Sequence, residues 1–82
     1  MTTDYMEEDL RGLFAQVMNL SASQVHSEMD QDSCGTWTSL NHLMLISQIE
    51  SRFGVRFANQ EISTMTTYGR VAQTLANHLS PV

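Results

Sequence analysis

A serine and a histidine lie close together near the middle of the chain, where a long polar segment gives way to a helical pattern. Ser39 lies in the first turn of this predicted helix, and His42 follows at i + 3 on a neighbouring part of its surface. A hydroxyl in a first turn is exposed because no helical turn precedes it. Unpaired N–H groups and positive potential also gather there and favour an attached phosphate. Two chemistries are therefore open: Ser39 as a nucleophile beside a base, or Ser39 as the attachment point of a phosphate-linked group.

The nucleophile hypothesis has little support elsewhere in the sequence. No third residue is evidently placed to orient His42, which points towards the apolar side of its helix and so is better interpreted as a packed histidine. His26 and His78 are interpreted as isolated surface residues, and there is no Gly-rich phosphate loop or pair of carboxylates on a strand scaffold. We therefore predict no catalytic residue, and a hydrolase built on Ser39 and His42 is a remote alternative.

Charge and cysteine content exclude several classes of protein. The formal charge is −5, from four arginines and nine acids with no lysine, so we expect no nucleic-acid or membrane partner. Such a surface suits a partner with a basic patch, or reflects solubility alone. Cys34 is the single cysteine, and no Cys/His cluster has zinc-ligand spacing, so neither a disulfide nor a metal is expected. No signal peptide or membrane-spanning run is recognisable, and a reducing cytoplasm is the default expectation.

The first helix is predicted behind Asp4, taken as its N-cap with Glu7 at the third position. Its apolar residues recur at helical spacing: Leu10, Leu13, Phe14 and Val17, with Leu20 one step on. The periodicity fails from residue 21 to residue 37, so a long loop is expected there. We expect three of its side chains to anchor this loop to the core: Val25, Met29 and Trp37.

The second helix is predicted from Ser39 to Phe53, with Thr38 as its N-cap and Gly54 in a left-handed conformation at its end. A helical wheel gives a broad apolar face that we predict to be core: Leu43, Leu45, Ile46, Ile49 and Phe53. The opposite side carries a small uncharged stripe, consisting of Leu40, Met44, Ser47 and Ser51, flanked by Asn41 and Gln48. This stripe is either a docking surface or a set of scattered surface residues, and both interpretations stay open.

The rest of the chain predicts a short extended link at residues 55–57 and a short helical segment over residues 59–65. Thr66 or Thr67 is expected to cap a last helix, which Ser80 and Pro81 end. Its apolar face is Tyr68, Val71, Ala72, Leu75 and Leu79. The prediction is an all-α fold, a small four-helix bundle of three main helices and one short helix, in a single domain over residues 1–82.

Three short motifs resemble the acyl carrier protein family and its peptidyl carrier relatives over nearly the whole chain. Residues 37–43 (WTSLNHL) place a serine–leucine pair at the start of the second helix. Residues 49–57 (IESRFGVRF) follow with the apolar-Glu-x-x-Phe-Gly run of the family at the same spacing. Residues 66–71 (TTYGRV) are similar to the family's entry to the last helix. The resemblance rests on the three motifs together, which occur in the family's order and at its spacing in a chain of the family's length.

The resemblance implies that Ser39 accepts 4′-phosphopantetheine from coenzyme A through a phosphopantetheinyl transferase, and that the arm's thiol holds acyl groups as thioesters. It also implies that Leu40, Met44 and Ser47 face partner enzymes, namely acyl-loading and condensing or tailoring enzymes. Ile62 and Met65 would border a groove for the acyl chain. The expected protein is a free-standing, monomeric and non-catalytic carrier, and the start at Met1 and the end after Pro81 favour a separate protein.

Two departures from the family bear on the pathway. Thr38 stands where the family usually has Asp, which keeps a helix cap and removes a negative charge that a transferase could pair with. The second helix is also poor in acids, with Glu50 and Arg52 as its charged residues. This pattern favours a polyketide or other specialised pathway over housekeeping fatty-acid synthesis. A peptidyl carrier of a nonribosomal pathway and an unmodified carrier-like interaction module stay open as alternatives.

Overall fold

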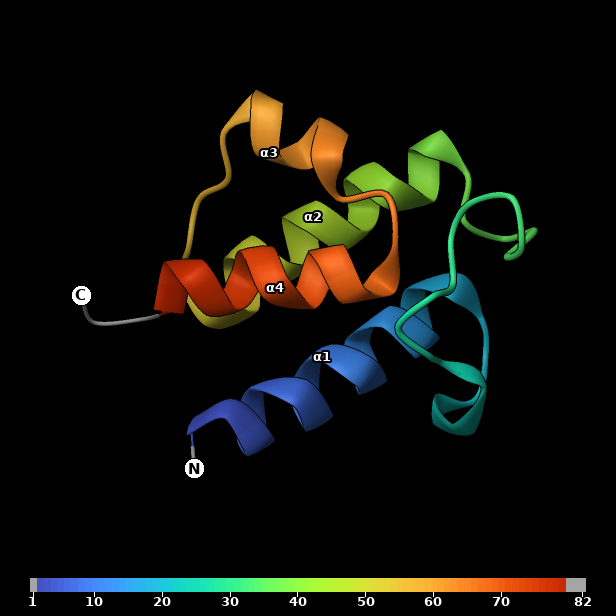
Figure 1. Cartoon of the computed structure of the whole chain (residues 1–82), viewed down its shortest axis with the longest axis horizontal. Helices are drawn as coiled ribbons and strands as arrows, with labels where there is room; N and C mark the ends of the chain where they lie inside the picture. The colour runs from blue at the N-terminus through green and yellow to red at the C-terminus, as the bar shows by residue number, and fades with distance from the viewer. Residues whose placement is uncertain (1, 80–82) are drawn as a thin grey trace.

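The computed structural model describes residues 2–79, which form four α-helices and one short 3-10 helix. These elements are α1 (Thr2–Met18), η1 (Ala22–Gln24), α2 (Ser39–Phe53), α3 (Asn59–Thr64) and α4 (Tyr68–Leu79). The described part has no strand, and only an isolated antiparallel bridge joins Asp30 to Thr67. In the view of Figure 1, α1 and α3 lie on opposite sides of α2 and α4, and the long loop leads from α1 to the start of α2. The predicted all-α bundle, with three main helices, one short helix and a long first loop, is confirmed.

Aromatic side chains from three parts of the chain meet at the centre of the core. Phe14 of α1 is fully buried, and its ring makes edge-to-face contacts with Trp37 at 5.0 Å and with Tyr68 at 5.1 Å between ring centroids. Val25 and Met29 are also buried, so the predicted anchoring of the long loop by three side chains is confirmed. The loop that leads to Ser39 is therefore held on the same core as the helices.

Helix α1 begins earlier and ends earlier than the sequence pattern predicted. It starts at Thr2, so Asp4 lies inside the helix and the prediction that Asp4 is the N-cap is wrong. An acidic residue is favourable anywhere in the first turn, because the helix dipole is positive there, and no helix breaker precedes Asp4. At the other end Asn19 takes a left-handed conformation with φ 59°, and the Leu20 N–H donates to the Ala15 carbonyl at 2.8 Å. This Schellman-type ending turns the chain into the loop.

Helix α2 has the bounds that its caps predicted. The Thr38 hydroxyl accepts a hydrogen bond from the Asn41 N–H at 3.1 Å, and Gly54 at the other end has φ 68°. Both caps are local features, so a sequence can specify them without tertiary contacts.

One residue of the predicted α2 core is wrong. Leu45, Ile46 and Ile49 are buried and Phe53 is partly buried, but Leu43 is 59% exposed. On a wheel of about 100° per residue Leu43 falls roughly a third of a turn from the centre of the buried face. It faces the side of α2 where α3 is short and leaves a shallow groove.

The short helix and the last helix predicted for the C-terminal part are found, with small changes in their bounds. Helix α3 ends at Thr64, one residue before the predicted end. The Thr67 hydroxyl accepts from the Arg70 N–H at 3.1 Å, so Thr67 is the one of the two threonines that caps α4. Tyr68, Val71 and Leu75 of α4 are buried. The expected stop at Ser80 and Pro81 lies outside the described residues.

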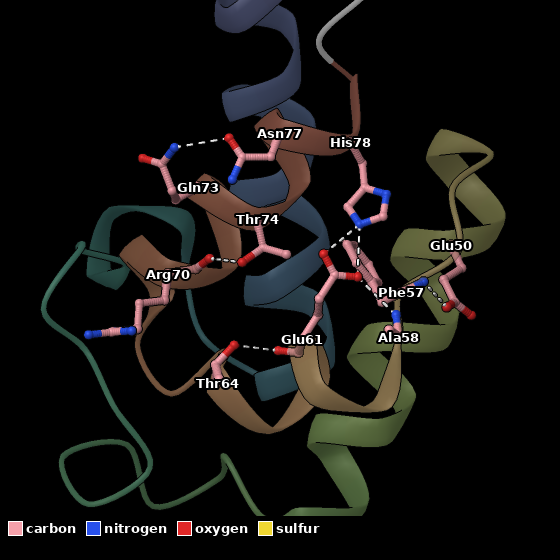
Figure 2. Close-up of polar contacts among 10 residues, drawn as sticks. All are labelled: Glu50, Phe57, Ala58, Glu61, Thr64, Arg70, Gln73, Thr74, Asn77 and His78. Carbon is pink, nitrogen blue, oxygen red and sulfur yellow. Dashed lines mark hydrogen bonds and ion pairs between the residues drawn. The ribbon is translucent and has the colours of Figure 1, made fainter. Parts of the chain in front are cut away.

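Polar contacts hold α3 in place, because none of its residues is fully buried. Glu61 accepts from the Ala58 N–H at 2.9 Å and from His78 Nε2 on α4, at 2.9 Å to each of its oxygens (Figure 2). The His78 ring also lies edge-on to Phe57, with 4.9 Å between centroids. His78 is a surface residue, as predicted, but the prediction that it is isolated is wrong. The Ala58 N–H first and His78 second lower the pKa of Glu61 from its ordinary value of 4.5. Helix α3 is therefore tied to α4 by one carboxylate.

Candidate functional site

Ser39 is the first residue of α2 and is exposed. Thr38 before it has an extended backbone, with φ −83° and ψ 172°, and its hydroxyl takes up the Asn41 N–H. The N–H groups of Ser39 and Leu40 lie in the first turn, where a helix provides no acceptor of its own. A negatively charged group joined to the Ser39 oxygen therefore meets the positive end of the helix dipole and free backbone donors.

The chain before Ser39 is fixed by side chains that bond back to its carbonyls. Asn41 Nδ2 donates to the Thr36 carbonyl at 2.7 Å, and Gln31 Nε2 donates to the Trp37 carbonyl at 3.2 Å. Trp37 itself is buried in the core. Ser39 thus stands on a rigid junction. The sequence did not predict these contacts, because an Asn or Gln in a sequence does not show which backbone group its side chain will bond to.

His42 connects the loop, α2 and α3 and has no free basic nitrogen. Its Nδ1 lies 3.0 Å from Trp37 Nε1, an indole N–H that can only donate. The hydrogen bond therefore assigns the neutral tautomer with a proton on Nε2, which donates to the Ile62 carbonyl of α3 at 3.0 Å. The partly buried, packed histidine expected from the sequence is found, and the lone pair that a hydrolytic base would need is occupied.

A groove opens beside Ser39, between α2 and α3. Its volume is about 330 Å³, and it is lined by Gln31, Ser39, His42, Leu43, Asn59, Ile62, Ser63, Met65 and Thr66. Ile62 and Met65, the two residues expected beside an acyl chain, lie on the walls of this same groove. Met65 is almost completely buried and Ile62 is partly buried, so both offer apolar atoms to a group that enters from Ser39.

The uncharged stripe of α2 is exposed along its length. Leu40, Met44, Ser47 and Ser51 are all exposed. Ser51, at the far end, lines a separate hollow between α1 and α2 in which Arg52 pairs with Asp9 at 3.3 Å. The part of the stripe that adjoins Ser39 is therefore its apolar part, Leu40 and Met44.

The loop is also pinned to the start of α4. The Tyr68 N–H donates to the Met29 carbonyl and the Gly69 N–H donates to the Ser27 carbonyl, both at 2.9 Å. A Cβ on Gly69 would lie 3.0 Å from that Ser27 oxygen, so a glycine permits this close approach.

Ser33 lowers the pKa of Asp30 from its ordinary value by donating backbone and side-chain hydrogen bonds to it.

Neither a metal-binding cluster nor a membrane-spanning helix is found within residues 2–79. Within residues 2–79, no three histidine, cysteine or acidic side chains are grouped so as to hold a metal ion. The helices of the same residues include none with the length and apolar character that crossing a membrane requires. Cys34 is buried, with its sulfur 3.4 Å from the Thr36 hydroxyl.

The comparisons with known proteins give one kind of match. No protein-family model matches the chain, and no curated protein matches it. Among solved structures 23 chains match, including the solution NMR structure of holo acyl carrier protein from Geobacter metallireducens. That chain is 25% identical, with a TM-score of 0.79, and the alignment covers 88% of this chain and 83% of the other. The fold expected from the three sequence motifs is confirmed by this match.

Proposed function

We propose that this chain, an acyl carrier protein by its fold, carries acyl intermediates on a 4′-phosphopantetheine arm joined to Ser39. The observation that carries the proposal is the exposed hydroxyl at the first position of α2, on a rigid junction and beside an apolar groove. Residues 1–82 then act as one carrier domain that is not itself catalytic. Its partners are a phosphopantetheinyl transferase and the enzymes that load, extend or modify the acyl group.

Attachment needs a base from the transferase, since His42 has none to offer. The Ser39 oxygen forms a bond to the phosphorus that bears the pantetheine, and the pyrophosphate bond of coenzyme A breaks. Adenosine 3′,5′-bisphosphate leaves, and the hydroxyl proton passes to the transferase. When attached, the arm supplies a thiol that holds acyl groups as thioesters.

The residues around Ser39 suit this group. The first-turn N–H groups of α2 and the helix dipole stabilise the phosphodiester by roughly 0.3–1 kcal/mol at an exposed site. Ile62 and Met65 line the groove into which a cargo of modest size can fold back from Ser39. Leu40, Met44, Ser47 and Ser51 form the partner-facing side of α2 in this proposal.

Thr38 and the scarcity of acids on α2 support a polyketide or other specialised pathway, because a housekeeping carrier is expected to be acidic there. Thr38 also supports a second candidate. It keeps the cap through the Asn41 N–H but has no negative charge for a transferase to recognise. In that case the chain is an unmodified interaction module that docks through Leu40 and Met44. A variant of the first candidate is a peptidyl carrier, which holds an aminoacyl group in place of an acyl group on the same arm.

The test is the intact mass of the purified chain before and after incubation with coenzyme A and a broad-specificity phosphopantetheinyl transferase. We expect a gain of one phosphopantetheine unit in the native chain and none in Ser39→Ala. If neither gains mass, the incubation is repeated with Thr38→Asp, which restores the acid and keeps the cap. A Thr38→Asp variant that also stays unmodified contradicts the carrier and favours the interaction module.

A further inference from the structure

A second pocket lies between α1, the long loop and α4, and it shares no residue with the groove beside Ser39. The two helices lie side by side in Figure 1. The volume of this α1–α4 pocket is about 300 Å³, at the lower end of the sizes of small-molecule sites. Its lining includes three apolar side chains, Met6, Ala72 and Ala76, and three that can form hydrogen bonds, Glu7, Arg11 and Tyr68.

The Tyr68 hydroxyl has no hydrogen-bond partner in the described part of the chain, and it is the only buried side-chain polar atom there without one. Tyr68 is 3% exposed, and its ring packs edge-on to Phe14 in the core. Burial raises the pKa of Tyr68 from its ordinary value of 10.0, so the hydroxyl stays protonated and can donate. Because folded proteins rarely leave such a group unpaired, the hydroxyl indicates a partner from outside the chain.

Contacts within the fold hold the walls of the α1–α4 pocket in place. Arg11 Nη1 of α1 donates to the Val25 carbonyl of the loop, and the guanidinium lies 5.8 Å from the centroid of the Tyr68 ring. On the opposite wall, the Gly69 N–H of α4 donates to the Ser27 carbonyl at 2.9 Å. The pocket is therefore formed before any ligand enters, which lowers the cost of binding.

The rim of the pocket can open towards the hydroxyl. The Tyr68 hydroxyl is closed to water in the unliganded chain, so a ligand atom reaches it only if a neighbouring side chain moves. Glu7 and Gln73 line the pocket and are exposed. Exposed side chains change rotamer within nanoseconds, so these two can turn aside to admit a ligand.

The chemistry of the lining selects one class of ligand. Arg11 and Glu7 carry opposite charges, and both act on the Tyr68 phenol, so the pocket favours neither an anion nor a cation. We propose that the α1–α4 pocket binds a small uncharged molecule with a carbonyl oxygen on a compact apolar body. The oxygen accepts from the Tyr68 hydroxyl, and the apolar body lies against the Met6, Ala72 and Ala76 side chains. This site goes beyond the carrier function and does not depend on modification of Ser39.

The experiment is a ¹H–¹⁵N NMR titration of the native chain with three probes that share a cyclohexane ring. Cyclohexanone is uncharged and offers a carbonyl, whereas cyclohexanecarboxylate and cyclohexylammonium are charged. The amides of Ser27, Gly69 and Ala72 report on the pocket. Tyr68→Phe keeps the ring and removes the hydroxyl, and Ala72→Leu fills the pocket. Both variants are first compared with the native chain by thermal unfolding.

We expect cyclohexanone to bind with a Kd on the order of 1–10 mM, with shifts centred on the pocket. Each charged probe should bind at least about fivefold more weakly, because the pocket would have to desolvate its charge. Tyr68→Phe should weaken cyclohexanone binding by about fivefold without lowering the midpoint of thermal unfolding. Ala72→Leu should abolish binding.

Three results would overturn the proposal: shifts that do not saturate by about 50 mM cyclohexanone, equal affinities in the native and Tyr68→Phe chains, or tighter binding of a charged probe. The first would leave water as the occupant of the pocket. None of these results bears on phosphopantetheine transfer to Ser39, so a failure here is distinct from a failure of the carrier function.

Discussion

The two ends of α2 differ in how far their side chains are committed to the fold. At the C-terminal end Glu50 bonds to the Phe57 N–H, Arg52 pairs with Asp9, and Gly54 turns the chain in a left-handed conformation. At the N-terminal end Ser39, Leu40 and Leu43 are exposed. The C-terminal end is therefore the committed end, where charged side chains bond to the chain itself, and the N-terminal end is the free end, where a serine and two leucines are accessible to a partner.

Two side chains are exceptions at the free end: one is Asn41, which donates to the Thr36 carbonyl, and the other is His42. His42 points inward and joins Trp37 to the Ile62 carbonyl, so it fixes α3 relative to α2 from the side of the groove. Glu61 and His78 fix α3 from the other side (Figure 2). The wall of the groove is therefore held by polar contacts at both sides and by little buried surface.

The largest expected effect is at the free end. Ser39→Ala removes the hydroxyl, so we expect phosphopantetheine transfer to be abolished, as measured by intact mass. The free energy of unfolding, measured with urea, should change by less than about 0.5 kcal/mol because Ser39 is exposed and the cap is Thr38. A Ser39→Ala chain that still gains mass would assign the modification to another residue.

A pair of leucines two residues apart tests the contrast between buried and exposed side chains on the same helix. Leu45 is fully buried, so Leu45→Ala should cost about 2–5 kcal/mol of unfolding free energy, whereas Leu43→Ala should cost less than about 0.5 kcal/mol. Urea unfolding of both variants measures the difference. Similar losses of unfolding free energy in the two variants would contradict the exposure of Leu43 and indicate that its side chain belongs to the core.

Removal of the His42 ring should destabilise the fold without affecting the chemistry at Ser39. His42→Ala leaves the indole N–H of buried Trp37 and the Ile62 carbonyl without their partner, at a cost of about 1–3 kcal/mol. The kcat of phosphopantetheine transfer at a temperature where the variant is folded should be unchanged. A kcat lowered by orders of magnitude would show that His42 takes part in the reaction.

At the committed end, Glu50→Ala removes the acceptor of the Phe57 N–H, and we expect a loss of about 1–2 kcal/mol. Glu50→Gln keeps an acceptor oxygen at the same place and is the matched control. Neither variant should change the KM of transfer, because Glu50 lies in the last turns of α2 and faces the chain's own backbone. A higher KM in Glu50→Gln would mean that the transferase recognises the negative charge of Glu50.

The smallest expected effect is a pH dependence of stability that arises from Glu61, the residue that joins α3 to His78 of α4. The pKa of Glu61 is lowered in the folded protein, so its contribution to stability is present above its ordinary value of 4.5 and is lost as the pH falls through the lower folded pKa. Thermal unfolding between pH 6 and pH 3 measures this loss, and Glu61→Gln should reduce the slope. An identical slope in Glu61→Gln would assign the acid sensitivity to other carboxylates such as Asp30.

Local signals predicted the parts of this fold that depend on local physics. The bounds of α2 follow from a threonine cap and a glycine that suits a left-handed turn, and the core positions of Leu45 and Ile49 follow from helical spacing. The exposure of Leu43 was not predictable in this way, because it depends on how much of α2 the short α3 covers. The partners of His42 and His78 lie 20 and 17 residues away in the chain, and no periodicity encodes such a pairing.

The groove likewise combines residues that the sequence could predict with residues that only the folding of the chain brings together. Ser39 could be found from its place at the start of a helix, and Ile62 and Met65 came from the resemblance to a family. That Gln31 of the loop and Thr66 before α4 line the same groove follows only from the packing of α3 and the loop against α2. The hydrogen bonds that hold the loop in front of Ser39 were likewise hidden, since any amide side chain in the loop could have made them.

The measurement that tests the central claim most directly is the location of the modification within the chain. The transferase-treated protein is cut after its arginines, and the peptide of residues 12–52, which contains Ser39, Ser47 and Ser51, is fragmented in the mass spectrometer. We predict that the whole phosphopantetheine mass lies on Ser39. Mass found on Ser47, Ser51 or another residue, or a peptide that remains unmodified even with Thr38→Asp, would contradict the assignment of the first residue of α2 as the carrier site.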